Sequence, residues 1–254
     1  MFVAIATTAN AQVVLNSKYF PDANFRKVLA RELKINEGDK ITEAKIAATT
    51  SITVAQYGKI ADLTGIEHFT ALTSLVCFDN QLTSLDVSKN TALQKLWCHD
   101  NQLTSLDVSK NTALTLLSCG SNQLTSLDVS KNTALETLWC DNNQLTSLDV
   151  SQNTALTHLY CGANRLTSLN VSKNTALTEL SCYENRLTSL DVSKNTALET
   201  LSCDDNQLTS LDVSKNTALW RLFCSGNQLK SLDVSNNPNL YEVVTGIESQ
   251  ESQW

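Results

Sequence analysis

A 21-residue repeat dominates this sequence of 254 residues. The stretch "LTSLVCFDNQLTSLDVSKNTA", residues 72–92, returns seven more times at the same spacing, and nearly all of its changes fall in the first half. Units that recur at a fixed period stack into one elongated body, so chain length does not count independent domains here. The repeat therefore predicts a solenoid.

Each unit contains two short segments with the alternation of an extended chain. Leu75 and Cys77 are two positions apart and should point the same way, and Leu85 and Val87 repeat this arrangement. Neither segment carries a 3.6-residue apolar period over the length of a helix. We expect one coil per unit with an extended segment on two sides, and the units start at Leu72, Leu93, Leu114, Leu135, Leu156, Leu177, Leu198 and Leu219.

A single unit is not expected to fold alone. Burying roughly seven apolar side chains contributes about 10 to 20 kcal/mol, and ordering the 21 residues costs at least as much. Stability must then come from the stacking of neighbouring units, as in other repeat proteins.

Asparagine recurs at two places in every unit, as Asn80 and Asn90 in the first. An asparagine amide carries donors and an acceptor, so it can pair with backbone groups of its own coil and of the next. We expect two asparagine ladders and regard glycan or metal sites at these positions as the weaker alternative, because buried backbone groups need partners in any case.

All eight cysteines fall at one position of the unit. Side chains in register on adjacent parallel strands lie roughly 4.7 to 4.9 Å apart and point the same way, whereas a disulfide needs converging Cβ atoms about 3.8 Å apart. We expect a buried column of reduced thiols, and the spacing lacks the paired CxxC ligands of zinc sites. No metal or other cofactor is expected. The column consists of Cys77, Cys98, Cys119, Cys140, Cys161, Cys182, Cys203 and Cys224.

Units of the form LxxLxCxxN resemble leucine-rich repeats, and a cysteine in the third apolar slot resembles the 21-residue repeats of internalin J-like proteins and related surface proteins of Bacteroidetes. The resemblance covers residues 50–246. It implies a right-handed solenoid of the α/β class, with a parallel sheet on the concave side and extended segments on the convex side. It also implies adhesion or recognition at a bacterial surface, without naming a ligand.

The segments outside the repeats are predicted as follows. "MFVAIATTANA" reads as a signal peptide over residues 1–11; no Lys or Arg precedes its apolar run, so either the start lies upstream or the pattern is coincidental. Residues 12–49 should form a small helical cap, with a helix over Pro21–Leu33 that begins at the proline. Ile52–Val54 should be the first strand. "LKINEGDKITEA" lacks the alternating carboxylates and the final Glu of a calcium loop and is expected to be structural. Residues 247–254 form a polar tail.

Charge and composition exclude several function classes. The net charge of −7 disfavours nucleic-acid binding. No stretch is long and apolar enough to span a bilayer. The many Ser and Asp residues follow from the period, so any Ser/His/Asp grouping is expected by chance, and no enzyme is predicted. Asp86 and Lys89 begin two columns of opposite charge, which we interpret as solvated scaffold.

The variable half of the unit carries the candidate binding surface. Positions that point outward from the first segment include large aromatic residues that folding does not require, and exposed aromatic clusters with polar rims mark interaction surfaces. Shielding of the sheet by aromatics is the simpler alternative. Trp139 and Tyr160 should stack. The partner-binding set is Trp97, Trp139, Tyr160, Tyr183, Phe223, Phe78, His99, His158, Asp141 and Asp204.

These patterns predict a secreted or cell-surface, monomeric recognition module that binds a host or neighbouring-cell protein through its concave face. Two alternatives stay open: a glycan-binding module, and a passive stalk. Asp79, Asp100, Glu184 and Asp205 follow the outward segments and make the face acidic, which would suit a basic or hydroxyl-rich partner.

Overall fold

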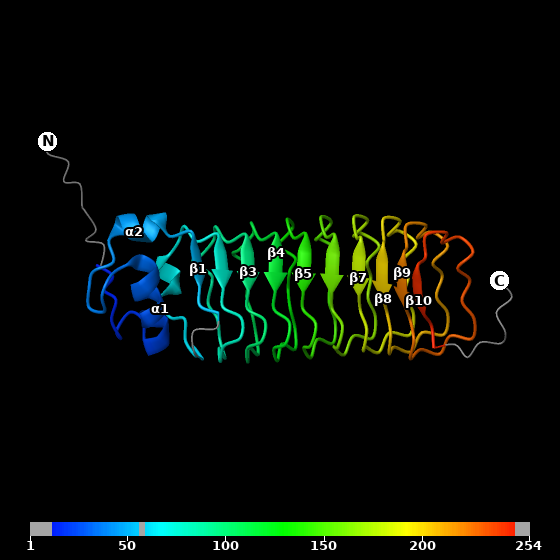
Figure 1. Cartoon of the computed structure of the whole chain (residues 1–254), viewed down its shortest axis with the longest axis horizontal. Helices are drawn as coiled ribbons and strands as arrows, with labels where there is room; N and C mark the ends of the chain where they lie inside the picture. Colours follow the sequence, from blue (N-terminus) through cyan, green and yellow to red (C-terminus); the bar gives the residue numbers. More distant parts are fainter. Residues whose placement is uncertain (1–11, 56–58, 247–254) are drawn as a thin grey trace, which may run out of the picture.

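The computed structural model describes residues 12–55 and 59–246. Its main feature is one parallel sheet of ten short strands whose spatial order follows the sequence (Figure 1). The strands are β1 (Ser51–Thr53), β2 (Ser74–Val76), β3 (Lys95–Trp97), β4 (Leu116–Ser118), β5 (Thr137–Trp139), β6 (His158–Tyr160), β7 (Glu179–Ser181), β8 (Thr200–Ser202), β9 (Arg221–Phe223) and β10 (Glu242–Val244).

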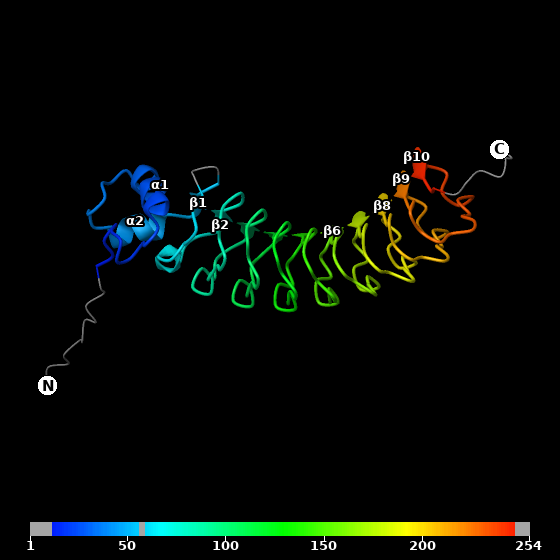
Figure 2. The ribbon, with the colours of Figure 1, turned by 90° about the horizontal axis from the view of Figure 1, so that it is seen from below.

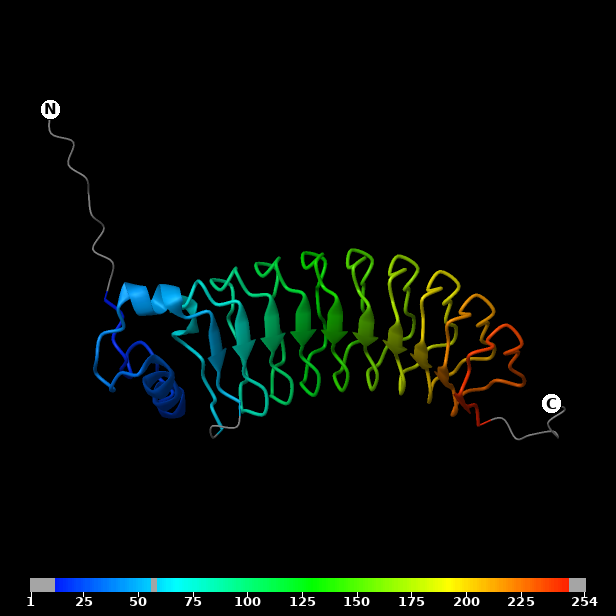
Figure 3. The same ribbon diagram turned by 45° about the horizontal axis from the view of Figure 1, so that its top comes forward.

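Successive coils superimpose in phase. Leu75 pairs with Leu96, and Leu96 pairs with Leu117, so each coil advances the strand by one repeat. The stack curves into an arc, and the strands lie along its inner side (Figure 2). Loops connect the strands above and below the sheet in the oblique view (Figure 3). The predicted solenoid with a concave parallel sheet is therefore the observed architecture.

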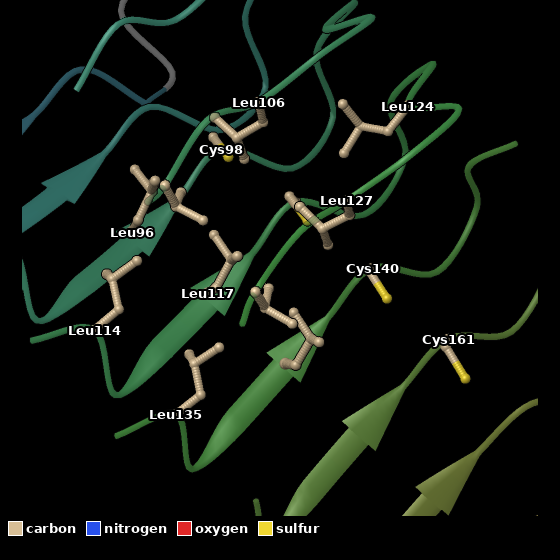
Figure 4. Close-up of a cluster of buried hydrophobic side chains, with 14 of the residues drawn as sticks. Leu96, Cys98, Leu106, Leu114, Leu117, Leu124, Leu127, Leu135, Cys140 and Cys161 are labelled. Atoms are coloured by element: carbon tan, nitrogen blue, oxygen red, sulfur yellow. The ribbon is translucent and has the colours of Figure 1, made fainter. Parts of the chain in front are cut away.

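The interior of each coil repeats the same apolar set. In the first full coil Leu72, Leu75, Cys77, Leu82 and Val87 are fully buried. Equivalent side chains of neighbouring coils pack against one another along the axis (Figure 4). Leu85 is 9% exposed and closes the core on the convex side, where the segment is extended but belongs to no sheet.

The first asparagine ladder ties each coil to the coil before it. Asn101 donates from Nδ2 to the carbonyl oxygens of Cys98 (3.2 Å) and Cys77 (3.0 Å), and its Oδ1 accepts from the backbone N–H of Leu82 (3.0 Å). Donors and acceptor are all used, because the amide sits in the turn where backbone groups of two coils converge. The predicted ladder is confirmed, from Asn80 to Asn227.

The second ladder uses only its donors. Asn132 donates to the carbonyl oxygens of Val108 (3.0 Å) and Asn111 (2.9 Å), one coil earlier. Its Oδ1 is buried and forms no hydrogen bond among the described residues, and the same holds for the equivalent residues Asn90, Asn111, Asn153, Asn174, Asn195, Asn216 and Asn237. This second ladder thus satisfies two buried carbonyls per coil and leaves one amide oxygen of its own unpaired.

The eight cysteines form the predicted column of free, buried thiols. Cys140 and Cys161 point the same way from consecutive coils (Figure 4). Burial raises the pKa of Cys77 and of Cys161 to about 12, so the thiols stay protonated and pack as small apolar groups.

The two helices lie at the amino-terminal end of the sheet, in α1 (Ala23–Leu33) and α2 (Glu43–Ala48) (Figure 1). Helix α1 buries Phe25, Val28, Leu29 and Leu33, the face expected from the sequence. It starts two residues later than predicted, because the Asp22 carboxylate caps the N–H groups of Asn24 (2.8 Å) and Phe25 (2.9 Å). Pro21 therefore precedes the cap and is not in the first turn.

Three further expectations concern the chain ends and the surface. The expected signal peptide at 1–11 and the polar tail at 247–254 lie outside the described residues. Strand β1 spans Ser51–Thr53, one residue before the expected Ile52–Val54. Neither helix of the described segments has the length and apolar character needed to cross a membrane.

The fixed acidic column is held by local turns. Asp128 accepts a hydrogen bond at Oδ1 from the backbone N–H of Ser130 (2.8 Å), and Asp107 does the same with Ser109 (2.8 Å). Asn170 replaces the aspartate in one coil and keeps the bond to Ser172 at 3.0 Å. The column is thus a series of Asx turns, and none of the ion pairs among the described residues joins it to the lysine column.

Candidate functional site: an aromatic hollow on the concave face

The strands place alternate side chains on opposite sides of the sheet. In β5 and β6 the central leucines, Leu138 and Leu159, are buried, and the residues on either side of each are half-buried. The outward positions predicted from the sequence therefore face the concave side. Among the middle column from Val76 to Phe223, all are half-buried except Ser118, which is 2% exposed.

Four of the predicted residues line one shallow hollow of about 340 Å³, namely Trp139, Asp141, Tyr160 and Tyr183, and we call it the aromatic hollow. Strands β5 and β6 pair Trp139 with Tyr160 in register. The two rings are neighbours, with centroids 5.7 Å apart, but their planes meet at 66°. The expected stacking is therefore wrong in detail: the rings meet edge to face and form a corner.

Two glycines create the space for this arrangement. A Cβ atom added to Gly162 would overlap Cδ1 and Cε1 of Tyr183, so that ring lies across the glycine of the preceding coil. A Cβ atom added to Gly120 would come within 2.9 Å of Asp141 Oδ1. Both side chains thus lean toward the amino-terminal end, and together with Trp139 and Tyr160 they line the same hollow.

The hollow contains the carboxylate of Asp141, Glu179 lies on the neighbouring strand, and neither has a basic partner among the described residues. Burial, with a smaller contribution from the charge of Asp141, raises the pKa of Tyr183. Burial followed by hydrogen bonding to Glu179 raises the pKa of Tyr160. Asn142 Nδ2 donates to Asp141 Oδ2 at 2.7 Å. Neither Asp141 nor Glu179 belongs to any ion pair formed by residues 12–55 or 59–246.

A second hollow of about 220 Å³ adjoins the first and shares Trp139 and Asp141 with it; we call it the histidine hollow, and its other lining residues are His99, Asp100, Ser118, Gly120 and Ser121. The His99 ring stacks on Phe78 with centroids 4.5 Å apart and planes at 11°. The two hollows form one continuous stretch of the concave face.

One Ser/His/Asp grouping occurs in the histidine hollow. Ser118 Oγ lies 2.9 Å from His99 Nδ1, but His99 Nε2 and Asp100 Oδ2 are 3.9 Å apart, beyond hydrogen-bond reach. Ser118 is also 2% exposed, which keeps its hydroxyl from a substrate. The grouping therefore has neither the geometry nor the access of a catalytic triad.

The other predicted site residues lie outside both hollows. Trp97 is separated from Trp139 by Ser118 of β4. His158 Nδ1 contacts Thr157 Oγ1 at 2.8 Å. Asp204 accepts from the Ser225 hydroxyl (2.8 Å), the Ser225 N–H (3.0 Å) and the Ser202 hydroxyl (3.0 Å), so its carboxylate is already satisfied. Phe223 lies three coils beyond Tyr160 in the middle column.

The acidic residues that follow the strands have a backbone explanation. Asp79, Asp100 and Asp205 have positive φ (54°, 52° and 52°), a conformation that Asp, Asn and Gly adopt most readily. The turn itself therefore favours these residues, which weakens the sequence argument that they mark a basic partner. Ala163 (φ 48°) and Glu184 (φ 46°) occupy the same position without that advantage. Ala163 follows Gly162, and Glu184 follows Tyr183.

Sequence reasoning missed three features. Gly120 and Gly162 occupy outward-pointing positions of the first segment in their units, but only the structure shows that neighbouring side chains cover them. Glu179 occupies another outward-pointing position, and its effect on the pKa of Tyr160 depends on how the Tyr160 side chain lies. Trp220, which is 37% exposed, lies just before β9 with the Arg221 guanidinium 4.0 Å from its ring centroid.

No group of three or more His, Cys, Asp or Glu side chains in the described segments is arranged to hold a metal ion. A larger hollow of about 720 Å³ lies on the cap and includes Lys40, Glu43 and His68.

A family model described as leucine-rich repeats in two copies matches residues 70–111, 112–153 and 133–174. These matches include the coils of Trp139, Asp141 and Tyr160 and end before Tyr183. The chain is a leucine-rich repeat protein. Its 21-residue unit with a buried cysteine column is of the internalin J type, and an 87-residue segment, 34% of this chain, is 45% identical to internalin J of Listeria monocytogenes serotype 4b (strain F2365).

Solved structures extend the likeness along the leucine-rich repeats. The functional domain of internalin J from Listeria monocytogenes, described as including a cysteine ladder, matches with a TM-score of 0.75 and 38% identity over 92% of this chain and 56% of that domain. Internalin C2 of Listeria monocytogenes strain 4b F2365 matches over 93% of this chain and 98% of its own with a TM-score of 0.73; at 21% identity it supports the fold alone.

The leucine-rich repeat chain spans only part of its internalin J relative. The matched segment covers 9% of that protein's length. The whole relative thus contains much that this sequence does not represent.

Proposed function

We propose that this leucine-rich repeat protein is a recognition module that is exported to, or held at, the bacterial surface and binds a protein partner through its concave face. The centre of the binding surface is the aromatic hollow. The observation that carries the proposal is the convergence of three aromatic rings and one carboxylate without a basic partner among the described residues, in one hollow of an otherwise nearly invariant repeat.

The fixed half of the unit supports this reading. It provides the Asx turns and the second asparagine ladder, which the fold needs in every coil. The first half also keeps the buried leucines, the cysteine and the first asparagine ladder constant, and its changes include the positions that the concave face displays. Aromatic side chains at such positions are enriched in protein interfaces. The likeness to internalin J is consistent with this kind of surface interaction.

The proposal is tested by capture. The protein is immobilised and exposed to surface proteins of candidate host and neighbouring cells, with the double variant Trp139→Ala, Tyr160→Ala beside it. Trp220→Ala is the matched control, because it removes an exposed aromatic residue outside both hollows. We expect the double variant to lose the captured partner and the control to keep it.

A glycan partner is the second candidate, because aromatic rings beside a carboxylate also suit a sugar with its apolar face and hydroxyl groups. A glycan array probed with the same three proteins separates the two. Glycan binding that depends on Trp139 and Tyr160 would replace the protein-binding proposal. A stalk predicts that the double variant matches the parent protein in both assays.

Export is tested separately, since the expected signal peptide lies outside the described residues. Expression of the chain in a bacterial host followed by amino-terminal sequencing of the secreted product should show cleavage after Ala11. Retention of the intact chain inside the cell would contradict export.

A further inference from the structure

The aromatic hollow combines features that distinguish it from a flat stacking platform. Trp139 and Tyr160 meet at 66°, so their faces do not form one continuous plane. Tyr183 lies across Gly162 and brings a third ring to the same hollow. Rings set at angles surround a compact group on several sides, whereas a sugar ring stacks best on one open aromatic face.

The charge inside the hollow is negative and uncompensated. Asp141 shares the hollow with the three rings, and the one hydrogen bond that the described residues make to its carboxylate comes from the neutral amide of Asn142 (2.7 Å). Glu179, on the strand that pairs with that of Tyr160, adds a second carboxylate beside the hollow. Neither residue is one of the positive-φ turn acids, so the backbone does not explain their presence.

Aromatic faces and carboxylates attract the same kind of group. The negative π-face of Trp or Tyr favours a cation within about 6 Å of the ring, and Trp is the strongest of these partners. A carboxylate beside the rings adds a charge-assisted hydrogen bond to the same cation. A partly desolvated hollow strengthens both interactions, because water screens them less.

We infer that the aromatic hollow is an anchor site for a cationic side chain of the partner, a guanidinium or an alkylammonium group, held by Trp139, Tyr160 and Tyr183 around it and by Asp141. This inference rests on the proposed protein-binding function and specifies the partner's chemistry at one position. A guanidinium should bind more tightly than an ammonium, since it is planar, stacks on rings and can pair with a carboxylate through two N–H groups.

The test uses small probes that need no identified partner. The indole N–H resonance of Trp139, assigned by its absence in Trp139→Phe, is followed by NMR during titration with Nα-acetyl-arginine amide. Nα-acetyl-citrulline amide is the neutral analogue of nearly the same shape, and Nα-acetyl-lysine amide is the ammonium arm. Methyl glycosides of glucose and N-acetylglucosamine form the sugar arm.

We expect a saturable shift with the arginine probe, a weaker one with the lysine probe, and none with citrulline or the sugars. Asp141→Asn should weaken arginine binding by about fivefold or more, since it removes the charge and keeps the shape of the side chain. Asp205→Asn removes an exposed carboxylate outside both hollows and should change binding less than about twofold.

Equal shifts with arginine and citrulline, a response to sugars alone, or no effect of Asp141→Asn would each overturn the cation site. The outcomes for the proposed function can be told apart from the outcomes for the cation site. Loss of a captured protein in the Trp139→Ala, Tyr160→Ala variant without arginine binding would leave the proposed function standing and remove this inference. Arginine binding without any captured partner would leave the site and remove the proposed function.

Discussion

The aromatic ring of Tyr183 occupies the space that a Cβ atom on Gly162 would need. Gly162→Ala should therefore push the ring out of the aromatic hollow, while the backbone at position 162 accepts alanine because Gly162 is not among the positive-φ residues. In the parent protein the Gly162 Hα protons should show a ring-current shift, and the same shift should be absent in Tyr183→Ala. The crystal structure of Gly162→Ala should show Tyr183 displaced.

A double-mutant cycle gives the control for this relationship. Tyr183→Ala and Gly162→Ala should weaken arginine-probe or partner binding by similar factors, and the combined variant should lose little more, because both changes remove the same ring. Fully additive losses would show that Gly162 acts on something other than Tyr183.

The cysteine column predicts slow thiol chemistry in the native protein. The thiolate is the reactive species, and burial raises the pKa of Cys77 and Cys161 to about 12 and that of Cys224 to about 11. At pH 8 an aromatic disulfide reagent should label fewer than about one thiol in minutes under native conditions and all eight in guanidinium.

Cys224 should react first among the eight. Its pKa is raised less than that of Cys77, and the coil that follows it is less well packed, with Leu229, Leu232 and Leu240 only partly buried. Mass spectrometry of the first labelled peptide checks this order. Rapid native labelling of most cysteines would contradict the buried column itself.

The repeat made the fold readable from the sequence, because one period fixes the register of every strand at once. The spacing of Leu75 and Cys77 placed one side chain set in the core, and identical spacing in each unit aligned the sets along the axis. The apolar face of helix α1 predicted the helix correctly, but the predicted start at Pro21 was wrong. The Asp22 side chain accepts the hydrogen bonds of the first free N–H groups, so the helix begins after Asp22.

The candidate site could be predicted from the sequence only in part. The outward columns followed from alternation, yet whether neighbouring members share a hollow depends on how each side chain leans along the axis. Asp141 and Tyr183 lean over glycines of the preceding coil, and Asp204 turns to Ser225 of the following coil. Spacing alone carries no information on this choice, so Trp97 and Asp204 were grouped with residues that lie in a different part of the face.

The Asx turns predict a loss of stability in acid. Hydrogen bonds from the Ser130 N–H and then its hydroxyl hold the pKa of Asp128 below its usual value, and six equivalent aspartates, Asp86, Asp107, Asp149, Asp191, Asp212 and Asp233, shift the same way. Because the folded pKa is the lower one, the stabilisation is fully present above the unfolded pKa and is lost as pH falls through the folded pKa. Urea midpoints should fall as pH decreases below about 4.

Asn170 supplies the natural control for this pH effect. It makes the same turn without a titrating group, with Ser172 N–H at 3.0 Å from its Oδ1. Asp128→Asn together with Asp107→Asn should therefore keep the turns and make the fall of the urea midpoint below about pH 4 less steep. An unchanged acid limb would show that other carboxylates control the transition.

Ala163 should be a site where substitution stabilises the protein. It has φ 48° in the turn where most other coils use Asp, Asn or Gly, and the left-handed conformation costs an L-residue roughly 1 kcal/mol or more. Ala163→Gly should raise the free energy of unfolding by about 0.5 to 1 kcal/mol after the entropy cost of glycine. Chemical denaturation measures the difference.

Ala155 is the matched control, because it ends the preceding coil and is not among the positive-φ residues. Ala155→Gly should lower the free energy of unfolding by about 0.5 to 1 kcal/mol. If both glycine variants lose stability, the left-handed turn carries no strain at Ala163.

The second asparagine ladder should contribute strongly to cooperative folding. Asn132 supplies a second hydrogen bond to the buried carbonyls of Val108 and Asn111, which also accept from the backbone N–H groups of Asn111 and Leu114. Asn132→Ala would remove one bond from each carbonyl, at about 0.5 to 1.5 kcal/mol each, so the variant should lose about 1 to 3 kcal/mol, less a part regained because its unpaired Oδ1 is also removed. Asn170→Ala removes only the exposed bond to Ser172 and should cost less than about 1 kcal/mol. Guanidinium denaturation followed by circular dichroism compares the two. Equal, small losses would mean that neighbouring backbone groups relax to satisfy the carbonyls, and the repeated asparagine would then need a different physical explanation.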